Sequence, residues 1–300
     1  MIKDPLVHVG MPKCASSWLQ RHFLKRPHGY RRCFGPLQAH LAFIAPRPFS
    51  WSRPRHIGLK VEDGLVPTIT CEMLSGNPLT GGADGEMILQ RLGGCIPNAR
   101  ILLVIREQRA MLRSLYQLLV TWGCPYDIDT LLGPGPVGNV PRFAPDYLCY
   151  DRIIGAYQQV FGAERVLVLP VELMQREPLE FLRKINAFAG VDEQRFPIHA
   201  DTGRRENAGR SLASLELKRL YNRYLAKNAF DLTGVFRPQE IQGAGNLEFS
   251  PPGFVAERQE RRFRLRVETA LENFYSASNA ETCVLTGLDL RAYGYQLATE

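Results

Sequence analysis

Residues 101–106 read ILLVIR, and an amphipathic segment follows them at once over 108–122. A short, uninterrupted apolar run is typical of a strand that is buried on both faces of a sheet, and two parallel strands need a crossover such as the helix that comes next. The same order of strand and helix recurs over 5–24 and over 165–190. This repetition predicts an α/β fold with a parallel sheet flanked by helices.

The predicted elements divide the chain into a part that carries the sheet and a helical part. We predict strands at 5–10, 57–61, 68–73, 101–106 and 165–172, and helices at 16–24, 86–92, 108–122, 146–162, 179–190, 214–227 and 258–275. The chain beyond about residue 195 shows no further strong strand pattern. We therefore expect one domain over 1–300, with a core of about residues 5–190 and a helical C-terminal extension from about 195 to 300.

Helical spacing also predicts which faces of two helices are buried. Over 108–122 the apolar positions at this spacing are Met111, Leu115, Leu118 and Trp122. A separate small and polar face of the same helix holds Ala110, Ser114, Gln117 and Thr121. Over 258–275 the apolar stripe is Phe263, Val267, Leu271 and Phe274, and we interpret the arginines of this segment as its solvated face.

Composition limits the classes of protein to consider. Hydrophobic residues make up 45% and charged residues 22%, as in a globular protein with a large core, and the net charge of +7 suits an anionic ligand. The sequence has no interleaved aromatic and basic repeat, so we expect no nucleic-acid partner. It also has no apolar run of roughly 18 to 20 residues and no room for a signal sequence before the first strand, which predicts a cytoplasmic protein without a membrane span.

The seven cysteines are scattered and show no CxxC or paired Cys/His spacing. We interpret them as reduced thiols, and we expect no metal site. The oligomeric state is left open by the sequence.

The turn between the first strand and its helix, GMPKCASS over 10–17, predicts an anion site. Free N–H groups and the positive end of a helix dipole meet at such a turn. In the ATP-binding pattern GxxxxGK[ST] counted from Gly10, Ser16 stands where the lysine belongs and Ser17 where the magnesium-binding hydroxyl belongs. Lys13 lies inside the loop instead, which favours a single terminal phosphate-like group and metal-free group transfer over triphosphate chemistry. An exposed lysine and an ordinary helix cap are the alternative reading.

A second predicted anion contact follows the strand 101–106. Arg106 ends this strand, and Ser114 lies eight residues later on the small polar face of the next helix. Ligands of open parallel sheets bind beyond the carboxyl ends of the strands, where both the loop after Gly10 and Arg106 are expected. A guanidinium with a nearby hydroxyl is well suited to hold a second phosphate.

Together these motifs resemble the sulfotransferase family that uses 3'-phosphoadenosine 5'-phosphosulfate (PAPS), and its bacterial carbohydrate-type members in particular. GMPKCASSWL is similar to the 5'-phosphosulfate loop, commonly GxPKxGTTxL, with Ala15 and a serine pair as departures. IREQRAMLRSLY is similar to the 3'-phosphate segment, with Glu-Gln in place of the frequent Asn-Pro. The phrases CEMLSG, RVLVLPVELM and LDLRAYGY also look like that family, so the resemblance touches most of 5–190 and the extreme C-terminus.

The resemblance implies a set of site residues. Lys13 would stabilise the bridging oxygen of the donor during sulfuryl transfer, and Arg106 with Ser114 would bind the 3'-phosphate. The 5'-phosphate would be held by the hydroxyls of the serine pair and by the backbone N–H groups of Cys14, Ala15, Ser16, Ser17 and Trp18. The donor would be PAPS, and the acceptor a hydroxyl of a carbohydrate or another acceptor.

The acceptor hydroxyl needs a general base, commonly His or Glu in the family. Glu72 is our first choice, because it would end a strand at the carboxyl edge of the sheet; a cap or salt bridge is the alternative role. His40 and Glu62 are weaker candidates, since a lone loop histidine is more often structural and Glu62 could form a surface ion pair.

Two other basic segments could contact the ligands. Asn207 and Arg210, in the segment 203–211, could fold over the adenosine or its 3'-phosphate, although a solvated loop would read the same. The segment 46–56 mixes aromatic residues with arginines, which suits an acidic glycan and would equally suit an exposed connector.

Two other classes of function compete with sulfuryl transfer. A P-loop kinase or related phosphotransferase would require magnesium, and a catalytically inactive nucleotide-binding protein would bind the donor without transfer. The acceptor is not predictable, because specificity in such folds depends on variable loops, here 25–56 and 124–147.

Overall fold

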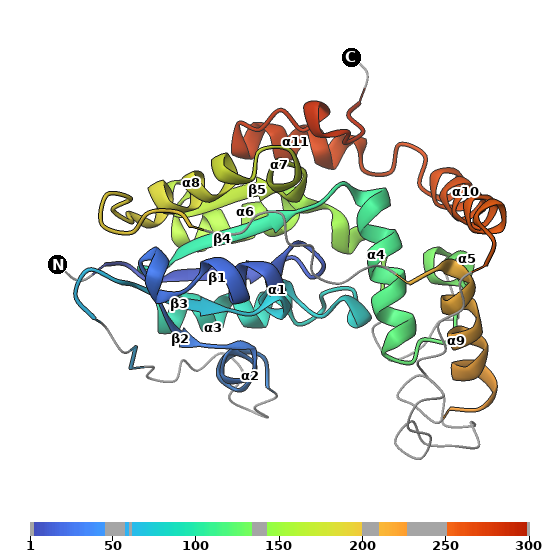
Figure 1. Cartoon of the computed structure of the whole chain (residues 1–300), viewed down its shortest axis with the longest axis horizontal. Helices are drawn as coiled ribbons and strands as arrows, with labels where there is room; N and C mark the ends of the chain where they lie inside the picture. The colour runs from blue at the N-terminus through green and yellow to red at the C-terminus, as the bar shows by residue number, and fades with distance from the viewer. Residues whose placement is uncertain are drawn as a thin grey trace.

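The computed structural model describes residues 3–45, 58–59, 62–133, 143–199, 210–226 and 251–298. Its centre is a five-stranded sheet in the order β2-β3-β1-β4-β5, and every neighbouring pair of strands is parallel. The strands are β1 (Leu6–Gly10), β2 (Tyr30–Phe34), β3 (Val66–Thr70), β4 (Arg100–Ile105) and β5 (Val166–Pro170). The predicted parallel α/β sheet flanked by helices is confirmed (Figure 1).

Helices connect the strands and continue after the last of them. The α-helices are α1 (Ser16–Trp18), α2 (Pro36–Ala39), α3 (Gly85–Cys95), α4 (Gln108–Thr121), α5 (Ile128–Leu132), α6 (Tyr150–Phe161), α7 (Val171–Arg176), α8 (Pro178–Ala189), α9 (Leu212–Tyr224), α10 (Gly253–Ala270) and α11 (Ser276–Thr286). Short 3-10 and π-helical segments include η1 (Leu19–Phe23), η3 (His40–Ile44), η4 (Glu72–Ser75) and η6 (Pro145–Leu148). No helix in the described ranges is both long enough and apolar enough to cross a membrane.

The middle of the sheet forms the centre of the core. All five residues of β1 and all five of β3 are buried, as are the last five of β4. Helices α6 and α8 contact both β4 and β5, and α11 packs on α6. Because parallel strands end together, the loop after β1, the turn after β3 and the start of α4 all meet at one edge of the sheet.

A group of helices stands beyond that edge. Helix α4 contacts α9 and α10, and α10 also contacts α5 and α9. Figure 1 shows these four helices together at the right of the view, beside the end of β4.

The structure corrects several sequence predictions about strands. The strand predicted at 68–73 ends at Thr70, and Glu72 opens the 3-10 segment η4. The strand predicted at 165–172 ends at Pro170, and α7 begins at Val171. Of the strand predicted at 57–61 only residues 58–59 are described, and they are not in a strand.

One strand, β2, and four α-helices, α2, α5, α7 and α11, were not predicted, and three of these helices have only four to six residues. Strand β2 reads YRRCF and lies at the edge of the sheet, where its arginines reach solvent and hide the apolar pattern. Helix α11 buries small and polar side chains, Ser276, Ser278, Asn279 and Thr282, so it lacks an apolar period.

The predicted buried faces of α4 and α10 are correct in part. Met111 and Leu115 are buried in α4, whereas the side chain of Trp122, just past its end, is 42% exposed. In α10, Phe263 and Val267 are buried, but Phe274, after the end of the helix, is 44% exposed because the neighbouring Tyr275 takes the inward position.

Candidate functional site

The loop between β1 and α1 begins at a position that only glycine can occupy. Gly10 has φ of +132°, and a Cβ there would lie 2.6 Å from the carbonyl oxygen of Glu72 and 2.9 Å from Oγ of Ser75. Left-handed backbone with no room for a side chain excludes every other residue. This close approach brings the start of η4, and therefore Glu72, against the loop.

Two non-glycine residues of the loop also adopt left-handed backbone. Lys13 has φ of 64° and Ala15 has φ of 59°. Such residues turn successive N–H groups toward one side and produce a concave surface that suits an anion. Ala15 stands where the resembling family carries glycine, and its conformation here is the one that glycine adopts most readily.

The start of the helix supplies further donors. The first N–H groups of a helix have no partner within it, and here they belong to the serine pair and Trp18. Oγ of the buried Ser16 donates to the carbonyl of Met11 at 3.4 Å. Trp18 is 4% exposed, and its indole N–H has no hydrogen-bond acceptor in the described part of the chain.

Arg106 lies against this loop. It follows the last residue of β4, and its Nη1 donates to the carbonyl oxygen of Lys13 at 3.4 Å, across 93 residues of sequence. The hydroxyl of Tyr150 donates to the Arg106 carbonyl at 2.6 Å and fixes the backbone there. The structure therefore brings together the two cations that the sequence placed at the ends of different strands.

The charges of this region act on one another. Burial lowers the pKa of Lys13, the positive charge of Arg106 lowers it further, and Glu72 opposes both effects. Two cations and one carboxylate thus share one half-buried edge of the sheet. Burial raises the pKa of the Cys14 thiol, which keeps that side chain neutral beside them.

Glu72 is the first residue of η4 and lies beside the helix that follows the loop. Its Oε2 accepts a hydrogen bond from Nε2 of Gln20 at 3.4 Å, and the same nitrogen donates to Oγ1 of Thr70 at 3.2 Å. The sequence pointed to Glu72 but missed Gln20, which has no motif of its own. Its proximity to Thr70 was not readable from the sequence, because the two residues are 50 positions apart.

A second carboxylate, that of Glu172, contacts the backbone next to Arg106. Oε1 of Glu172 accepts from the backbone N–H of Glu107 at 3.0 Å, and its Oε2 accepts from the hydroxyl of Tyr295 at 3.3 Å. Burial raises the pKa of Glu172, and Arg106 is among the groups that oppose this rise. The sequence did not assign a role to Glu172, although a carboxylate directly after a buried strand is a usable signal.

Glu107 stands where the resembling family frequently has Asn. Its carboxylate caps α4 by accepting from the N–H groups of Arg109 and Ala110, at 3.2 and 3.0 Å. This departure from the pattern therefore has a local structural role, because it satisfies free donors at the start of the helix.

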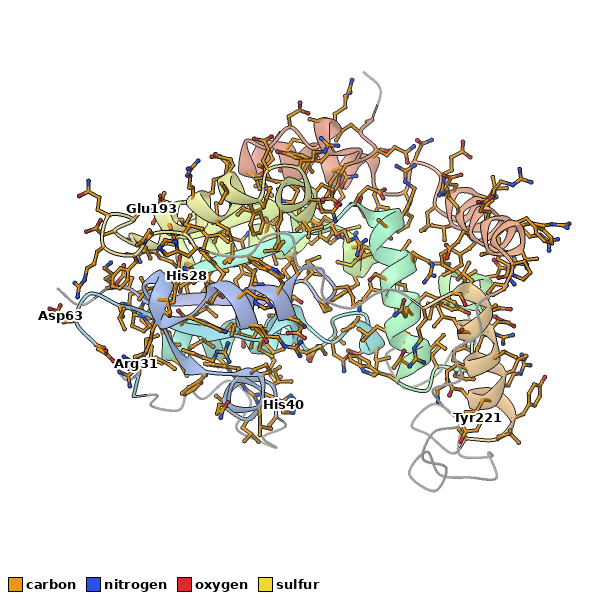
Figure 2. The ribbon with its side chains drawn as sticks, in the orientation of Figure 1. His28, Arg31, His40, Asp63, Glu193 and Tyr221 are labelled. Carbon is orange, nitrogen blue, oxygen red and sulfur yellow. The ribbon has the colours of Figure 1, made fainter. Side chains whose placement is uncertain are left out.

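The two weaker base candidates lie elsewhere. Glu62 pairs with Arg26 at 2.6 Å and with Arg31, and hydrogen bonding by Arg26 lowers the pKa of Glu62. It precedes β3, at the opposite end of the sheet from Lys13. His40 is exposed and opens η3 after α2, and Figure 2 shows it on the lower edge of the molecule.

The residues predicted to bind the 3'-phosphate do not all contact one another. Ser114 is half-buried in α4, and no contact in the described ranges links it to Arg106. The backbone N–H of Arg210 donates to Oε1 of Gln117 at 3.2 Å, and Nη2 of Arg113 donates to the Arg210 carbonyl at 2.9 Å. Arg210 therefore lies beside the polar face of α4, whereas Asn207 and the segment 46–56 fall outside the described residues.

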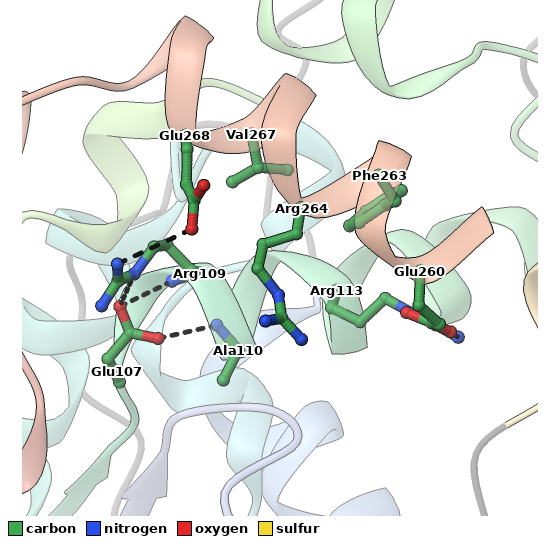
Figure 3. Close-up of a pocket in the computed structure, with 9 residues that line it drawn as sticks. All are labelled: Glu107, Arg109, Ala110, Arg113, Glu260, Phe263, Arg264, Val267 and Glu268. Carbon is green, nitrogen blue, oxygen red and sulfur yellow. Dashed lines mark hydrogen bonds and ion pairs between the residues drawn. The ribbon is translucent and has the colours of Figure 1, made fainter. Parts of the chain in front are cut away.

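A cavity of about 390 Å³ lies between the first turns of α4 and the helix α10 (Figure 3). Glu260 of α10 pairs with Arg113 of α4 at 2.8 Å on one side, and Arg109 approaches Glu268 to 4.0 Å on the other. Arg264 lies between these pairs and has no acidic partner in the described part of the chain. None of Lys13, Glu72, Arg106 and Ser114 lines this cavity.

Chemically, the edge at Lys13 can hold an anion and accept a proton. The N–H groups and hydroxyls of the loop are able to bind an anion, the ammonium is able to neutralise negative charge, and the carboxylate is able to accept a proton. Within the described residues, no group of three or more His, Cys, Asp and Glu side chains could hold a metal ion.

Comparisons with known proteins give structural neighbours only. No family model matches the chain, and no curated protein matches it. Its structure is similar to a sulfotransferase from Alicyclobacillus acidocaldarius, with 19% identity, a TM-score of 0.45 and coverage of 74% of this chain and 95% of that one.

Two further solved structures are similar as well. Mouse sulfotransferase SULT7A1 complexed with PAP has 14% identity, a TM-score of 0.38 and coverage of 94% of this chain and 88% of that one. The sulfotransferase domain from the curacin biosynthetic pathway has 12% identity, a TM-score of 0.38 and coverage of 99% of each chain.

Proposed function

We propose that this chain is a sulfotransferase, which moves a sulfuryl group from PAPS to a hydroxyl of a carbohydrate or another acceptor. One observation carries the proposal: the guanidinium of Arg106 contacts the backbone of Lys13 inside a loop of left-handed turns. Two cations held side by side at a row of free N–H groups favour a ligand with more than one anionic group. The donor PAPS carries a phosphosulfate and a separate 3'-phosphate.

The residues present fit such a donor. The loop from Cys14 to Trp18 would hold the 5'-phosphate through N–H groups and the hydroxyls of Ser16 and Ser17. Arg106 and Ser114 would hold the 3'-phosphate, and Arg210, beside α4, would be a further contact with it. Asn207 stays a candidate from the sequence for the same contact.

Transfer needs one proton acceptor and one cation at the reacting group. Glu72 would take the proton of the acceptor hydroxyl, whose oxygen forms a bond to sulfur while the bond from sulfur to the bridging oxygen breaks. Lys13 would stabilise the negative charge that develops on the bridging oxygen, and adenosine 3',5'-bisphosphate (PAP) would leave. The charge of Glu72 opposes the lowering of the Lys13 pKa, which supports placing the proton acceptor and the cation at one reaction centre.

The experiment offers radiolabelled PAPS to the purified protein with a panel of glycans and small phenols, with EDTA and with added Mg²⁺. We expect transfer to at least one acceptor in EDTA, and a thermal shift with PAP. Labelled ATP with Mg²⁺ is the parallel arm for a phosphotransferase. Transfer only from ATP, or the absence of any PAP effect on melting, would overturn the proposal.

PAP binding without transfer to any acceptor would identify an inactive nucleotide-binding protein. Comparison with Glu72→Gln sharpens this outcome, because an inactive protein would bind PAP equally with and without the carboxylate and would transfer nothing in either form.

A further inference from the structure

A chain of hydrogen bonds runs from the buried middle of β1 to the carboxylate of Glu72. Nδ1 of His8 and Oγ1 of Thr70 are 2.9 Å apart. Nε2 of Gln20 donates to Oγ1 of Thr70 at 3.2 Å and to Oε2 of Glu72 at 3.4 Å. One amide nitrogen thus bridges a fixed strand residue and the proposed proton acceptor.

The direction of each hydrogen bond follows from the groups available. The amide of Gln20 must turn its NH₂ toward Glu72, because its carbonyl oxygen would be repelled by the carboxylate. Its second hydrogen is then donated to Oγ1 of Thr70, whose own hydrogen goes to Nδ1 of His8. Nε2 of His8 has no hydrogen-bond partner in either tautomer. The tautomer with the proton on Nδ1 would in addition leave the Thr70 hydroxyl hydrogen without an acceptor.

The end of this series of hydrogen bonds at His8 and Thr70 is rigid. His8 and Thr70 are fully buried and lie directly opposite each other in the pairing of β1 with β3. Burial lowers the pKa of His8 to about 4, so its imidazole stays a neutral acceptor at ordinary pH. Gln20 itself lies in η1, which continues the helix that opens after the Lys13 loop.

We infer that Gln20 is the positioning residue that fixes the Glu72 carboxylate for proton transfer. Gln20 holds Oε2, while Oε1 has no hydrogen bond within the described ranges and is left for the acceptor hydroxyl. The proton of the acceptor hydroxyl goes to Oε1 of Glu72. The hydroxyl oxygen bonds to sulfur while the bond from sulfur to the bridging oxygen breaks and PAP leaves. This role rests on the proposed function, and it explains how the anion loop and the base keep a fixed relation.

The test replaces Gln20 with methionine, an unbranched side chain of the same length that cannot donate. The matched control is Gln90→Met, which removes a 3.1 Å hydrogen bond from Gln90 to Glu86 on the surface of α3. We expect Gln20→Met to lower kcat about tenfold while the KM for PAPS and the Kd for PAP stay unchanged. Gln90→Met should change none of the three.

A second variant and a double-mutant cycle keep the test decisive. Thr70→Val should lower kcat less than Gln20→Met, because it loosens Gln20 without removing it. In a Glu72→Gln background, Gln20→Met should have no further effect on kcat, since the group that it positions is already lost. Equal losses in both backgrounds, or unchanged kcat with Gln20→Met, would overturn the inference.

The failures of the inference and of the proposed function are distinguishable. If the parent protein transfers sulfuryl and Gln20→Met transfers it equally well, only the inference fails. If the parent binds PAP and transfers to no acceptor, the proposed function fails and takes the inference with it. A melting temperature within a few degrees of the parent shows that Gln20→Met is folded. If Gln20→Met does not fold, Thr70→Val takes its place in the test.

Discussion

The loop after β1 and the contact between α4 and α10 both gather cations, but they balance the charge differently. Between the helices, Arg113 pairs with Glu260 at 2.8 Å, and Arg109 approaches Glu268 to 4.0 Å. At the loop, Arg106 donates to a carbonyl oxygen, and the repulsion between it and Lys13 adds to the lowering of the Lys13 pKa.

This difference separates a structural use of charge from the ligand-binding use that we propose for the loop. Cations that pair with carboxylates satisfy each other and hold two elements together. Lys13 and Arg106 form no ion pair with a carboxylate among the described residues, and holding two partly buried cations near each other is costly until an anion binds between them. Arg264, at the cavity between α4 and α10, shares this lack of an acidic partner within the described part of the chain, but it lies on an exposed helix face.

The largest expected effect comes from removing one of the two cations at the loop after β1. Lys13→Ala should lower transfer about a thousandfold, because it removes the charge that we propose stabilises the bridging oxygen, and it should cost little stability. Initial rates with radiolabelled PAPS and a melting curve measure both. Lys184→Ala is the control, since Lys184 pairs with Glu180 on α8 at 3.3 Å, and equal losses in the two variants would contradict the assignment.

The next effect concerns pH and the buried imidazole under the loop. The pKa of His8 is about 4 in the folded protein against an ordinary value of 6.5. Between these values the unfolded chain binds more protons, so stability should fall as the pH falls from about 6.5 to 4, by about 3 kcal/mol in all. Urea unfolding at pH 7, 6 and 5 measures this trend.

His8→Gln is the matching variant for that trend, because it does not titrate. It should be less stable than the parent at pH 7 and should lose part of the decline below pH 6.5. An identical decline in the parent and in His8→Gln would show that other groups cause it.

Arg106→Ala tests the second cation with a smaller expected effect. It should weaken PAP binding by about 1.5 to 3 kcal/mol, because charged hydrogen bonds to a phosphate are lost. Calorimetric titration with PAP measures the change. Arg152→Ala is the control, because it removes the same charge from an exposed pair with Asp146 at 2.6 Å and should change PAP affinity far less. Unchanged affinity in Arg106→Ala would count against the 3'-phosphate assignment.

The smallest expected effect comes from breaking an ion pair between α4 and α10. Glu260→Gln breaks the pair with Arg113, whose side chains are 42% and 23% exposed, so the free energy of unfolding should fall by less than about 1 kcal/mol. Urea unfolding at low and high salt measures this, and high salt should reduce the difference. A loss of several kcal/mol would show that α4 and α10 depend on this pair.

The sequence predicted the elements whose apolar pattern is continuous, and it missed those whose pattern is polar and the helices α2, α5 and α7, which are too short to show a helical period. β1, β4 and α4 were found because each has a clear apolar period. β2 was missed because an edge strand exposes arginines, and α11 because its buried side chains are polar and find partners far away: Asn279 shares hydrogen bonds with Gln108.

The candidate site divides in the same way. The proximity of Lys13 and Arg106 was predictable, because parallel strands end at one edge and each residue follows a strand. Gln20 was not predictable as part of the site, since its partner Glu72 lies 52 residues away. Glu172 follows a buried strand, but its contact with Glu107, 65 residues away, was not predictable. No local pattern marks a hydrogen bond formed across such distances.

The sequence by itself determined that the chain forms a parallel sheet and that a glycine, a lysine and two serines form the turn after its first strand, because apolar periodicity and turn chemistry are local properties. Only the tertiary structure decided that Glu72 begins a 3-10 turn against Gly10, that Gln20 holds its carboxylate, and that α4 and α10 neutralise each other's charges. These features arise from packing between distant segments, and packing is settled when the whole chain folds.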